Sequence, residues 1–126
     1  MNKHILIVDD ERPVGTLLAH TLDDMEDAGV EIVVADDAKG ALALCEQAPD
    51  LVFVAADQPG GIDLCRGLRD AFPDASMTIV LLVDKGHVID SDLCVALDVA
   101  ACVEKPFDPD RIRALACDAL GFEFEG

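Results

Sequence analysis

Acidic side chains and a lysine follow the ends of several apolar runs, and these residues are the ones best suited to chemistry. They are Asp9, Asp10, Glu11, Asp57, Asp84, Glu104 and Lys105. Carboxylates that converge with carbonyl groups and water suit a hard cation such as Mg²⁺, and Asp9, Asp10 and Asp57 are the candidate ligands. Lys105 would offset the repulsion between the carboxylates or bind an anion. The alternative is that these residues are only polar caps on buried strands.

The stretch LVFVAADQPGG at 51–61 departs from this pattern. Its apolar run leads into Ala55 and Ala56, and a carboxylate appears only at Asp57, beside a Pro-Gly-Gly turn. The last buried position of this run therefore carries a methyl group, whereas the neighbouring runs lead into charged groups. Asp57 itself suits a loop-capping role next to such a turn.

Short apolar runs alternate with segments of helical periodicity along the chain. Strands are expected at His4–Val8, Glu31–Ala35, Leu51–Ala56, Thr78–Val83 and Ala101–Glu104. Helices are expected at Glu11–Ala28, Ala38–Gln47, Ile62–Phe72, Asp90–Val99 and Pro109–Leu120. Because the strands are nearly continuous apolar runs, both faces of their sheet should be covered by helices. The pattern predicts a doubly wound parallel α/β fold, in which ligands bind at the carboxyl ends of the strands.

Composition limits the class of protein. A chain of 126 residues is expected to form one domain over residues 1–126, and it should be either a stand-alone protein or a module of a longer one. Its net charge of −17 disfavours nucleic-acid binding. No apolar stretch approaches the roughly 18 residues of a membrane span. Five scattered cysteines favour reduced thiols in the cytoplasm.

Motifs of common enzyme classes are absent from the sequence. There is no Gly-x-Gly-x-x-Gly after the first strand, no Walker motif and no Gly-x-Ser-x-Gly elbow. His4, His20 and His87 are scattered, and a surface position is expected for each. We therefore do not expect an enzyme.

Three motifs resemble the receiver domain of two-component response regulators. They are ILIVDDE at 5–11, PDLVFVAADQPG at 49–60 and EKPFDPDRI at 104–112. The resemblance covers essentially the whole chain and implies a flavodoxin-like (βα)5 sandwich with strand order 2-1-3-4-5. In that family an acidic pair holds Mg²⁺, an Asp that ends strand three accepts a phosphoryl group from a histidine kinase, and a lysine before a cis-proline contacts that group.

The match to the family's functional positions is incomplete. Asp9 and Asp10 match the acidic pair, and Lys105 and Pro106 match the lysine and the cis-proline. The acceptor position, four residues before Pro59, falls on Ala55, whose methyl group cannot accept a phosphoryl group. In the family, a Ser or Thr that ends strand four and an aromatic residue on strand five report phosphorylation. Here these two switch positions fall on Val83 and Cys102, which have neither the hydroxyl nor the aromatic ring.

The resemblance and these losses together predict a degenerate receiver, or pseudo-receiver. It would bind a protein partner of a two-component pathway, such as a histidine kinase, an output domain or another regulator, without phosphorylation. The expected surface is formed by the helix at 90–99, the strand at 101–104 and the helix at 109–120, through which a homodimer could also form; the first helix is a second candidate surface. No cofactor is required, and Mg²⁺ should bind weakly.

Two alternatives remain open. The domain could be an active receiver that is phosphorylated on Asp57 with Mg²⁺, although this would require a longer third strand. It could instead be a regulatory module that binds a metal or a small ligand through Asp9, Asp10 and Asp57.

Overall fold

The computed structural model of the protein describes residues 3–45, 48–57, 60–73, 75–86, 91–105 and 107–121. The strands are β1 (His4–Val8), β2 (Glu31–Ala35), β3 (Leu51–Ala55), β4 (Thr78–Asp84) and β5 (Val99–Lys105). The helices are α1 (Arg12–Thr21), α2 (Asp23–Asp27), α3 (Ala38–Ala43), α4 (Gly61–Ala71), α5 (Ser91–Leu97) and α6 (Pro109–Leu120).

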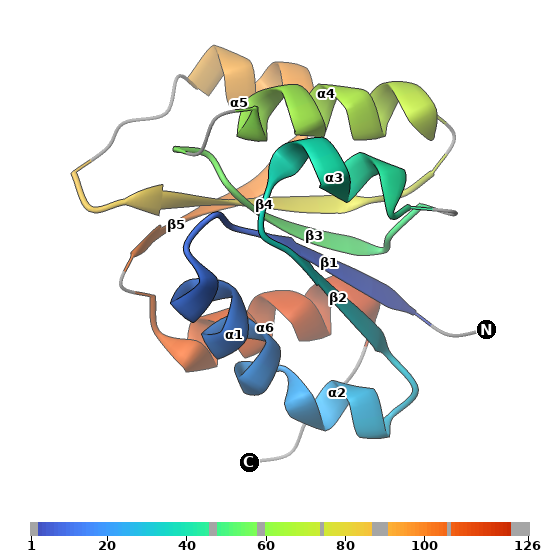
Figure 1. Ribbon diagram of the computed structural model, residues 1–126, viewed down its shortest axis with the longest axis vertical. Helices are drawn as coiled ribbons and strands as arrows, with labels where there is room; N and C mark the ends of the chain where they lie inside the picture. Colours follow the sequence, from blue (N-terminus) through green and yellow to red (C-terminus); the bar gives the residue numbers. More distant parts are fainter. Residues whose placement is uncertain are drawn as a thin grey trace.

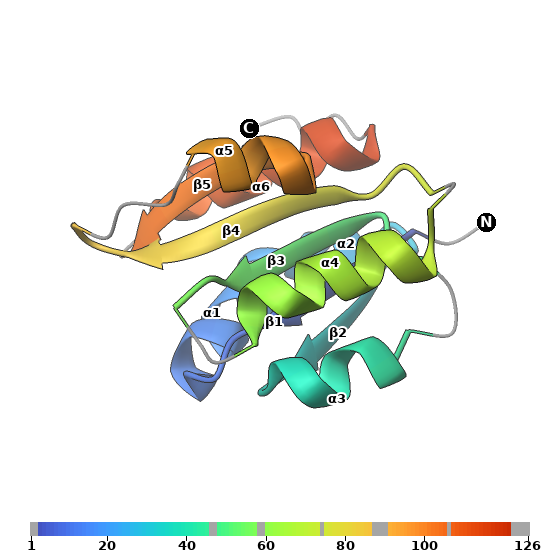
Figure 2. The ribbon, with the colours of Figure 1, turned by 90° about the horizontal axis from the view of Figure 1, so that it is seen from above.

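The strands form a five-stranded parallel sheet in the order β2-β1-β3-β4-β5. Helices α3, α4 and α5 lie on one face of this sheet, and α1, α2 and α6 lie on the other (Figures 1 and 2). This three-layer arrangement confirms the expected doubly wound fold and its strand order. The carboxyl ends of all five strands lie at the same end of the sheet, where ligands bind in folds of this kind.

Alternation along each strand divides the core into two layers. Ile7, Phe53 and Val103 belong to the layer under α1 and α6, whereas Val8 and Val54 belong to the layer under α3, α4 and α5. Most of these side chains are almost fully buried, and Phe53 is the one aromatic residue among the buried residues of the described chain. The side chains that follow each strand inherit this alternation, which decides the face on which a functional residue lies.

The helix expected over 11–28 is in fact two helices. α1 ends at Thr21, and α2 begins at Asp23 after a single non-helical residue, Leu22. Three acidic residues in the first turn of α2 favour a new helix start, since they interact with the positive end of its dipole. Leu22 and Met25 are both buried, so the apolar spacing predicted the buried face correctly but did not register the break.

The ends of α3 and α5 also differ from expectation, by more than one residue each. α3 ends at Ala43, so the described part of the segment expected to be helical up to residue 47 leaves the helix early. α5 ends at Leu97, and Val99, expected to be helical, already belongs to β5. Asp98 between them has a φ of 54°, a left-handed conformation that cannot continue a helix.

The carboxyl end of α5 is held by an arginine from α4. The Arg69 guanidinium donates hydrogen bonds to the carbonyl oxygens of Leu97 at 3.1 Å and Asp98 at 3.0 Å. These carbonyl groups lie where a helix leaves acceptors without intrahelical partners. Arg69 therefore fixes the end of α5 at the start of β5.

Replacing Arg69 with alanine should lower the free energy of unfolding by about 1–2 kcal/mol, because two charge-assisted hydrogen bonds are lost at a partly covered site. Urea denaturation measures the change. Arg66→Ala is the matched control on the same helix. Arg66 is exposed, and its ion pair, at 3.6 Å to Asp63 three residues earlier, is a weak surface interaction. That control should cost about 0.5 kcal/mol or less. Equal losses in the two variants would contradict the capping role of Arg69.

Candidate functional site

The residues expected to do chemistry lie where β1, β3 and β5 end. Asp9 follows β1, and Ala55 and Lys105 are the last residues of β3 and β5. Each lies two positions after a side chain of the α1/α6 core layer, namely Ile7, Phe53 and Val103. Strand alternation therefore brings Asp9, Ala55 and Lys105 to the same face of the sheet.

Asp9 and Lys105 form an ion pair at this edge. The Lys105 Nζ lies 2.9 Å from Asp9 Oδ2 and 4.0 Å from Glu11 Oε1. Asp9 is only 1% exposed, and its other oxygen, Oδ1, accepts a hydrogen bond from the Glu11 backbone N–H at 2.9 Å. A buried carboxylate needs such partners, since a charge without them is costly to remove from water. Lys105 thus neutralises the buried acid of the site.

The pKa of Lys105 reflects its ion pair with Asp9. Burial alone would lower the pKa of Lys105, but the adjacent Asp9, with Glu11 and Asp84 further away, outweighs burial and raises that pKa above its usual value. Lys105 therefore stays charged across the physiological pH range. A fixed positive charge at this point stabilises the Asp9 carboxylate or a bound anion.

Ala55 ends β3 without any polar group. Its side chain is 1% exposed, and β3 pairs it with Leu82 of β4. Val8 of β1 lies opposite Val54 of β3, so the residues that follow them, Asp9 and Ala55, reach the same level of the sheet. The position nearest to the Asp9–Lys105 pair on the central strand therefore carries a methyl group.

Asp57 lies beyond the end of the strand and is exposed. Its Oδ2 accepts a hydrogen bond at 2.7 Å from the backbone N–H of Asp84, the last residue of β4. The chain does not extend β3 to this residue, because β3 ends at Ala55. Asp57 thus ties the β3 loop to the end of β4.

The other acidic residues of the site face solvent. Asp10, Glu11, Asp84 and Glu104 are all exposed. Within the part of the chain that the structure describes, no group of three His, Cys, Asp or Glu side chains is close enough to hold a metal ion. Asp9, Asp10 and Asp57 are therefore not brought together as a ligand set, because Asp9 is paired with Lys105 and Asp57 with the β4 backbone.

The positions matched to the family's switch residues lie on β4 and β5. Val83 is 3% exposed near the end of β4, and its isopropyl group offers no hydrogen bond. Cys102 is exposed on β5, which is an edge strand of the sheet. Pro106, the cis-proline candidate, lies outside the described residues.

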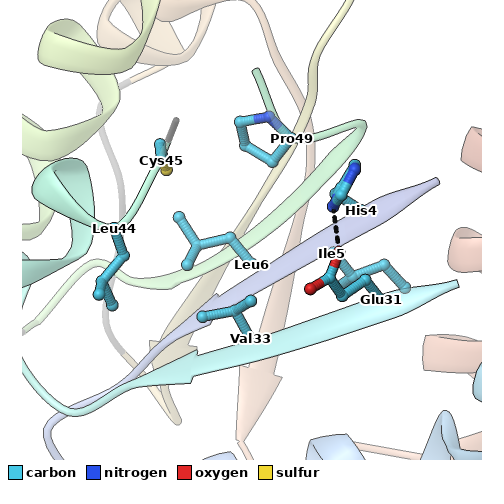
Figure 3. A pocket seen from close by; sticks show the side chains of 8 residues that line it. All are labelled: His4, Ile5, Leu6, Glu31, Val33, Leu44, Cys45 and Pro49. Atoms are coloured by element: carbon cyan, nitrogen blue, oxygen red, sulfur yellow. Dashed lines mark ion pairs between the residues drawn. The ribbon is translucent and has the colours of Figure 1, made fainter. Parts of the chain in front are cut away.

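Two hollows of the described surface bear on the site. One of about 240 Å³ adjoins the site and is lined by Asp9, Gly15, Thr16, Val34 and Asp36. The other, about 280 Å³, lies at the opposite, amino-terminal end of β1 and β2, between these strands and the segment after α3 (Figure 3). Its wall contains a His4–Glu31 ion pair of 3.2 Å (Figure 3). His4 begins β1 whereas Lys105 ends β5, so this hollow lies at the other end of the sheet from the Asp9–Lys105 pair. Asp36 beside the first hollow was not singled out from the sequence, because acidic residues before a helix usually read as caps.

The histidines are placed only partly as expected. His20 is exposed on α1, as predicted. His4 is partly buried, with 23% of its side chain exposed, because it lies inside β1 against Glu31. The surface position expected for His4 was therefore wrong, and His87 lies outside the described residues.

Comparison with known proteins agrees with this architecture. The family model described as the response regulator receiver domain matches residues 5–116. The chain is 35% identical over 120 residues to the alkaline phosphatase synthesis transcriptional regulatory protein PhoP of Bacillus subtilis, covering 90% of this chain and 47% of PhoP. It is 36% identical over 121 residues to the transcriptional regulatory protein CpxR of Klebsiella pneumoniae, covering 91% of this chain and 49% of CpxR.

Solved structures show the same fold. NtrX from Brucella abortus in complex with ADP superposes with a TM-score of 0.78 at 31% identity, covering 96% of this chain and 26% of NtrX. The REC domain of AraT, a response regulator from Geobacillus stearothermophilus, gives a TM-score of 0.81 at 24% identity, covering 94% of this chain and 93% of that domain.

The chain belongs to the response regulator receiver domain family, and it is a receiver domain of the two-component type. It spans about half the length of the curated relatives it matches. None of the described helices is long and apolar enough to cross a membrane.

Proposed function

We propose that this receiver domain acts as a protein-interaction module that does not depend on phosphorylation. The observation that carries the proposal is the buried methyl group of Ala55 at the end of β3, level with the Asp9–Lys105 ion pair. Phosphoryl transfer needs an oxygen nucleophile at the reacting position. Neither the methyl group of Ala55 nor the isopropyl group of Val83 supplies one.

The pairing of the remaining charges supports the same conclusion. Asp9 and Lys105 form an ion pair of 2.9 Å, and the Glu11 backbone N–H donates to the other oxygen of Asp9. A ligand shifts an equilibrium only through its different affinities for two states. Because the side chain at Ala55 makes no polar contact with phosphate, we infer that the conformation of the domain is set by its sequence or by a partner.

The alternative acceptor, Asp57, is less well placed for the chemistry. Its Oδ2 is engaged with the Asp84 backbone N–H at 2.7 Å, and Asp57 is exposed, outside the buried edge that holds Asp9 and Lys105. Phosphorylation at Asp57 would leave the Asp9–Lys105 pair without an evident role. The contacts of Asp9 and Asp57 described above give no reason to prefer the metal-binding alternative to the proposed interaction module.

The proposed partner surface is formed by α5, β5 and α6. Val95 on α5 is 81% exposed, the largest exposure among the exposed large apolar residues of the described chain. An isolated apolar side chain on a highly charged domain is suited to a partner's apolar pocket. We propose a histidine kinase, an output domain or another regulator as the partner, with a second copy of this domain as the other candidate for the same face.

A phosphodonor experiment tests the proposal directly. The domain is incubated with acetyl phosphate and Mg²⁺, and its intact mass is measured. We expect no gain of a phosphoryl group by the native domain, because Ala55 offers no nucleophile. Ala55→Asp is the positive arm and should gain one acid-labile phosphoryl group.

Asp57→Asn is the deciding control. If the native domain gains a phosphoryl group that this variant cannot gain, Asp57 is the acceptor and the proposal is wrong. Beryllofluoride with Mg²⁺, followed by amide chemical shifts, gives an independent measurement, and we expect shifts in Ala55→Asp only.

A further inference from the structure

Two cysteines that are separate in the sequence meet between α5 and β5. The Cys94 Sγ on α5 lies 3.8 Å from the Cys102 Sγ on β5. All five cysteines lie in the described chain as free thiols, and this is the one thiol–thiol contact among its described hydrogen bonds. The fold therefore brings together two thiols that lie on different elements.

The pair is accessible rather than buried in the core. Cys102 is exposed, and Cys94 is partly exposed, whereas Cys65 on α4 is fully buried. Residual burial and the neighbouring Cys94 raise the pKa of Cys102 to about 11. The raised pKa keeps Cys102 almost entirely in the thiol form at neutral pH, so its oxidation is slow. The contact between the two sulfur atoms, and not an activated thiolate, is therefore the observation that points to a disulfide.

The elements that carry the two sulfur atoms are held close together. Arg69 fixes the end of α5 through the carbonyl oxygens of Leu97 and Asp98, directly before β5 begins. Cys102 is held in the β5 ladder opposite Leu81. A disulfide has an S–S bond of about 2.05 Å, so the two sulfur atoms need to approach by roughly 1.8 Å. A disulfide between them therefore requires rotation of the side chains or a shift of α5 toward β5.

We propose that Cys94 and Cys102 are an oxidant-modified dithiol that closes to an intramolecular disulfide. With a hydroperoxide as oxidant, one thiolate attacks the peroxide oxygen, the O–O bond breaks, and the other oxygen leaves as an alcohol or water after taking a proton. The sulfenic acid formed is then attacked by the second thiol, which forms the S–S bond and releases water. Two thiols are oxidised, and one hydroperoxide is reduced.

The disulfide would join α5 to β5 within the proposed partner surface. Oxidation would then fix the position of Val95 and the rest of α5 against the sheet edge. This consequence rests on the proposed function, whereas the formation of the disulfide does not. Failure of the phosphodonor experiment would leave the dithiol chemistry untouched, and the reverse is also true.

Peptide mapping after oxidation tests the proposal. The domain is treated with hydrogen peroxide, the oxidant class of the proposed step, and is digested by a protease that cleaves before aspartate. Asp92, Asp98 and Asp108 place Cys94 and Cys102 on separate peptides, 92–97 and 98–107. The other three cysteines fall on three further peptides. We expect an intact mass lower by two hydrogen atoms and a reducible cross-link between the two named peptides.

Three serine variants make the assignment specific. Cys94→Ser and Cys102→Ser should each abolish the intramolecular cross-link. Cys117 is a half-buried cysteine on α6, and Cys117→Ser should retain the cross-link. The native domain should melt about 5 °C higher when oxidised than when reduced, because a crosslink restricts the unfolded chain. A cross-link to another cysteine, a covalent dimer, or oxygen added to single thiols without a cross-link would overturn the proposal.

Discussion

Replacing Lys105 with methionine should lower the free energy of unfolding by about 3 kcal/mol at pH 7, the largest single effect expected for the site. The lysine side chain is 13% exposed, and its Nζ is 2.9 Å from the buried Asp9 Oδ2. Methionine preserves much of the apolar stem, so the loss isolates the charge. Asp9 would be left as a buried carboxylate without its cation, which costs more than the pair contributes. Urea denaturation at pH 7 gives the measurement.

Two variants show whether the loss comes from the ion pair. Lys85→Met is the matched control, because Lys85 is exposed after β4, and it should cost about 0.5 kcal/mol or less. In the double variant Asp9→Asn with Lys105→Met, the asparagine oxygen can still accept from the Glu11 N–H while the orphaned charge is gone. The double variant should therefore lose less free energy of unfolding than the two single variants lose in sum. Simple additivity would contradict the pairing.

The pH dependence of this contribution follows from the direction of the shift. The pKa of Lys105 is raised in the folded domain above its ordinary 10.5, so the folded state binds its proton more tightly than the unfolded state. The stabilisation is fully present below about pH 10 and is lost as the pH rises through the raised pKa. Between pH 7 and 9 the difference between the native domain and Lys105→Met should therefore stay constant.

Replacing Ala55 with aspartate should also destabilise the domain, by about 2–3 kcal/mol at pH 8. The new carboxylate would be buried level with Asp9, where burial and the like charge of Asp9 raise its pKa. The Lys105 cation, which is already paired with Asp9, offsets this increase only in part. For an acid with a raised pKa, the stability is lost as the pH increases from the ordinary value toward the raised one. The cost should therefore be smaller near pH 4.5 than at pH 8. Thermal unfolding at the two pH values measures it.

The neighbouring alanine and a metal ion provide the controls for this change. Ala56→Asp introduces the same carboxylate at a partly exposed position after β3 and should cost about 1 kcal/mol or less. Mg²⁺ should return part of the lost stability to Ala55→Asp, because a second buried carboxylate beside Asp9 adds a metal donor. Equal Mg²⁺ stabilisation of the native domain would show that its donors suffice without residue 55.

The secondary structure of this domain follows largely from its local sequence pattern, whereas the contacts between its elements depend on packing. The apolar runs and helical spacing predicted all five strands and their parallel arrangement, since burial of apolar side chains dictates these features locally. They also predicted that Asp9, Ala55 and Lys105 lie at the carboxyl ends of the strands, whereas the strand order came from the family resemblance. The break at Leu22 was missed because both halves bury apolar residues with one continuous spacing. The partial burial of His4 was missed because its partner, Glu31, comes from another strand.

By itself, the sequence determined which residue types stand at the strand ends: an acid after β1, a methyl group at the end of β3 and a lysine at the end of β5. Only the tertiary structure decided which of them meet. Lys105 neutralises Asp9, Asp57 binds the Asp84 N–H instead of joining a metal site, and Cys94 approaches Cys102. Each of these contacts joins separate elements, and its distance depends on helix packing and strand register, which no local spacing encodes.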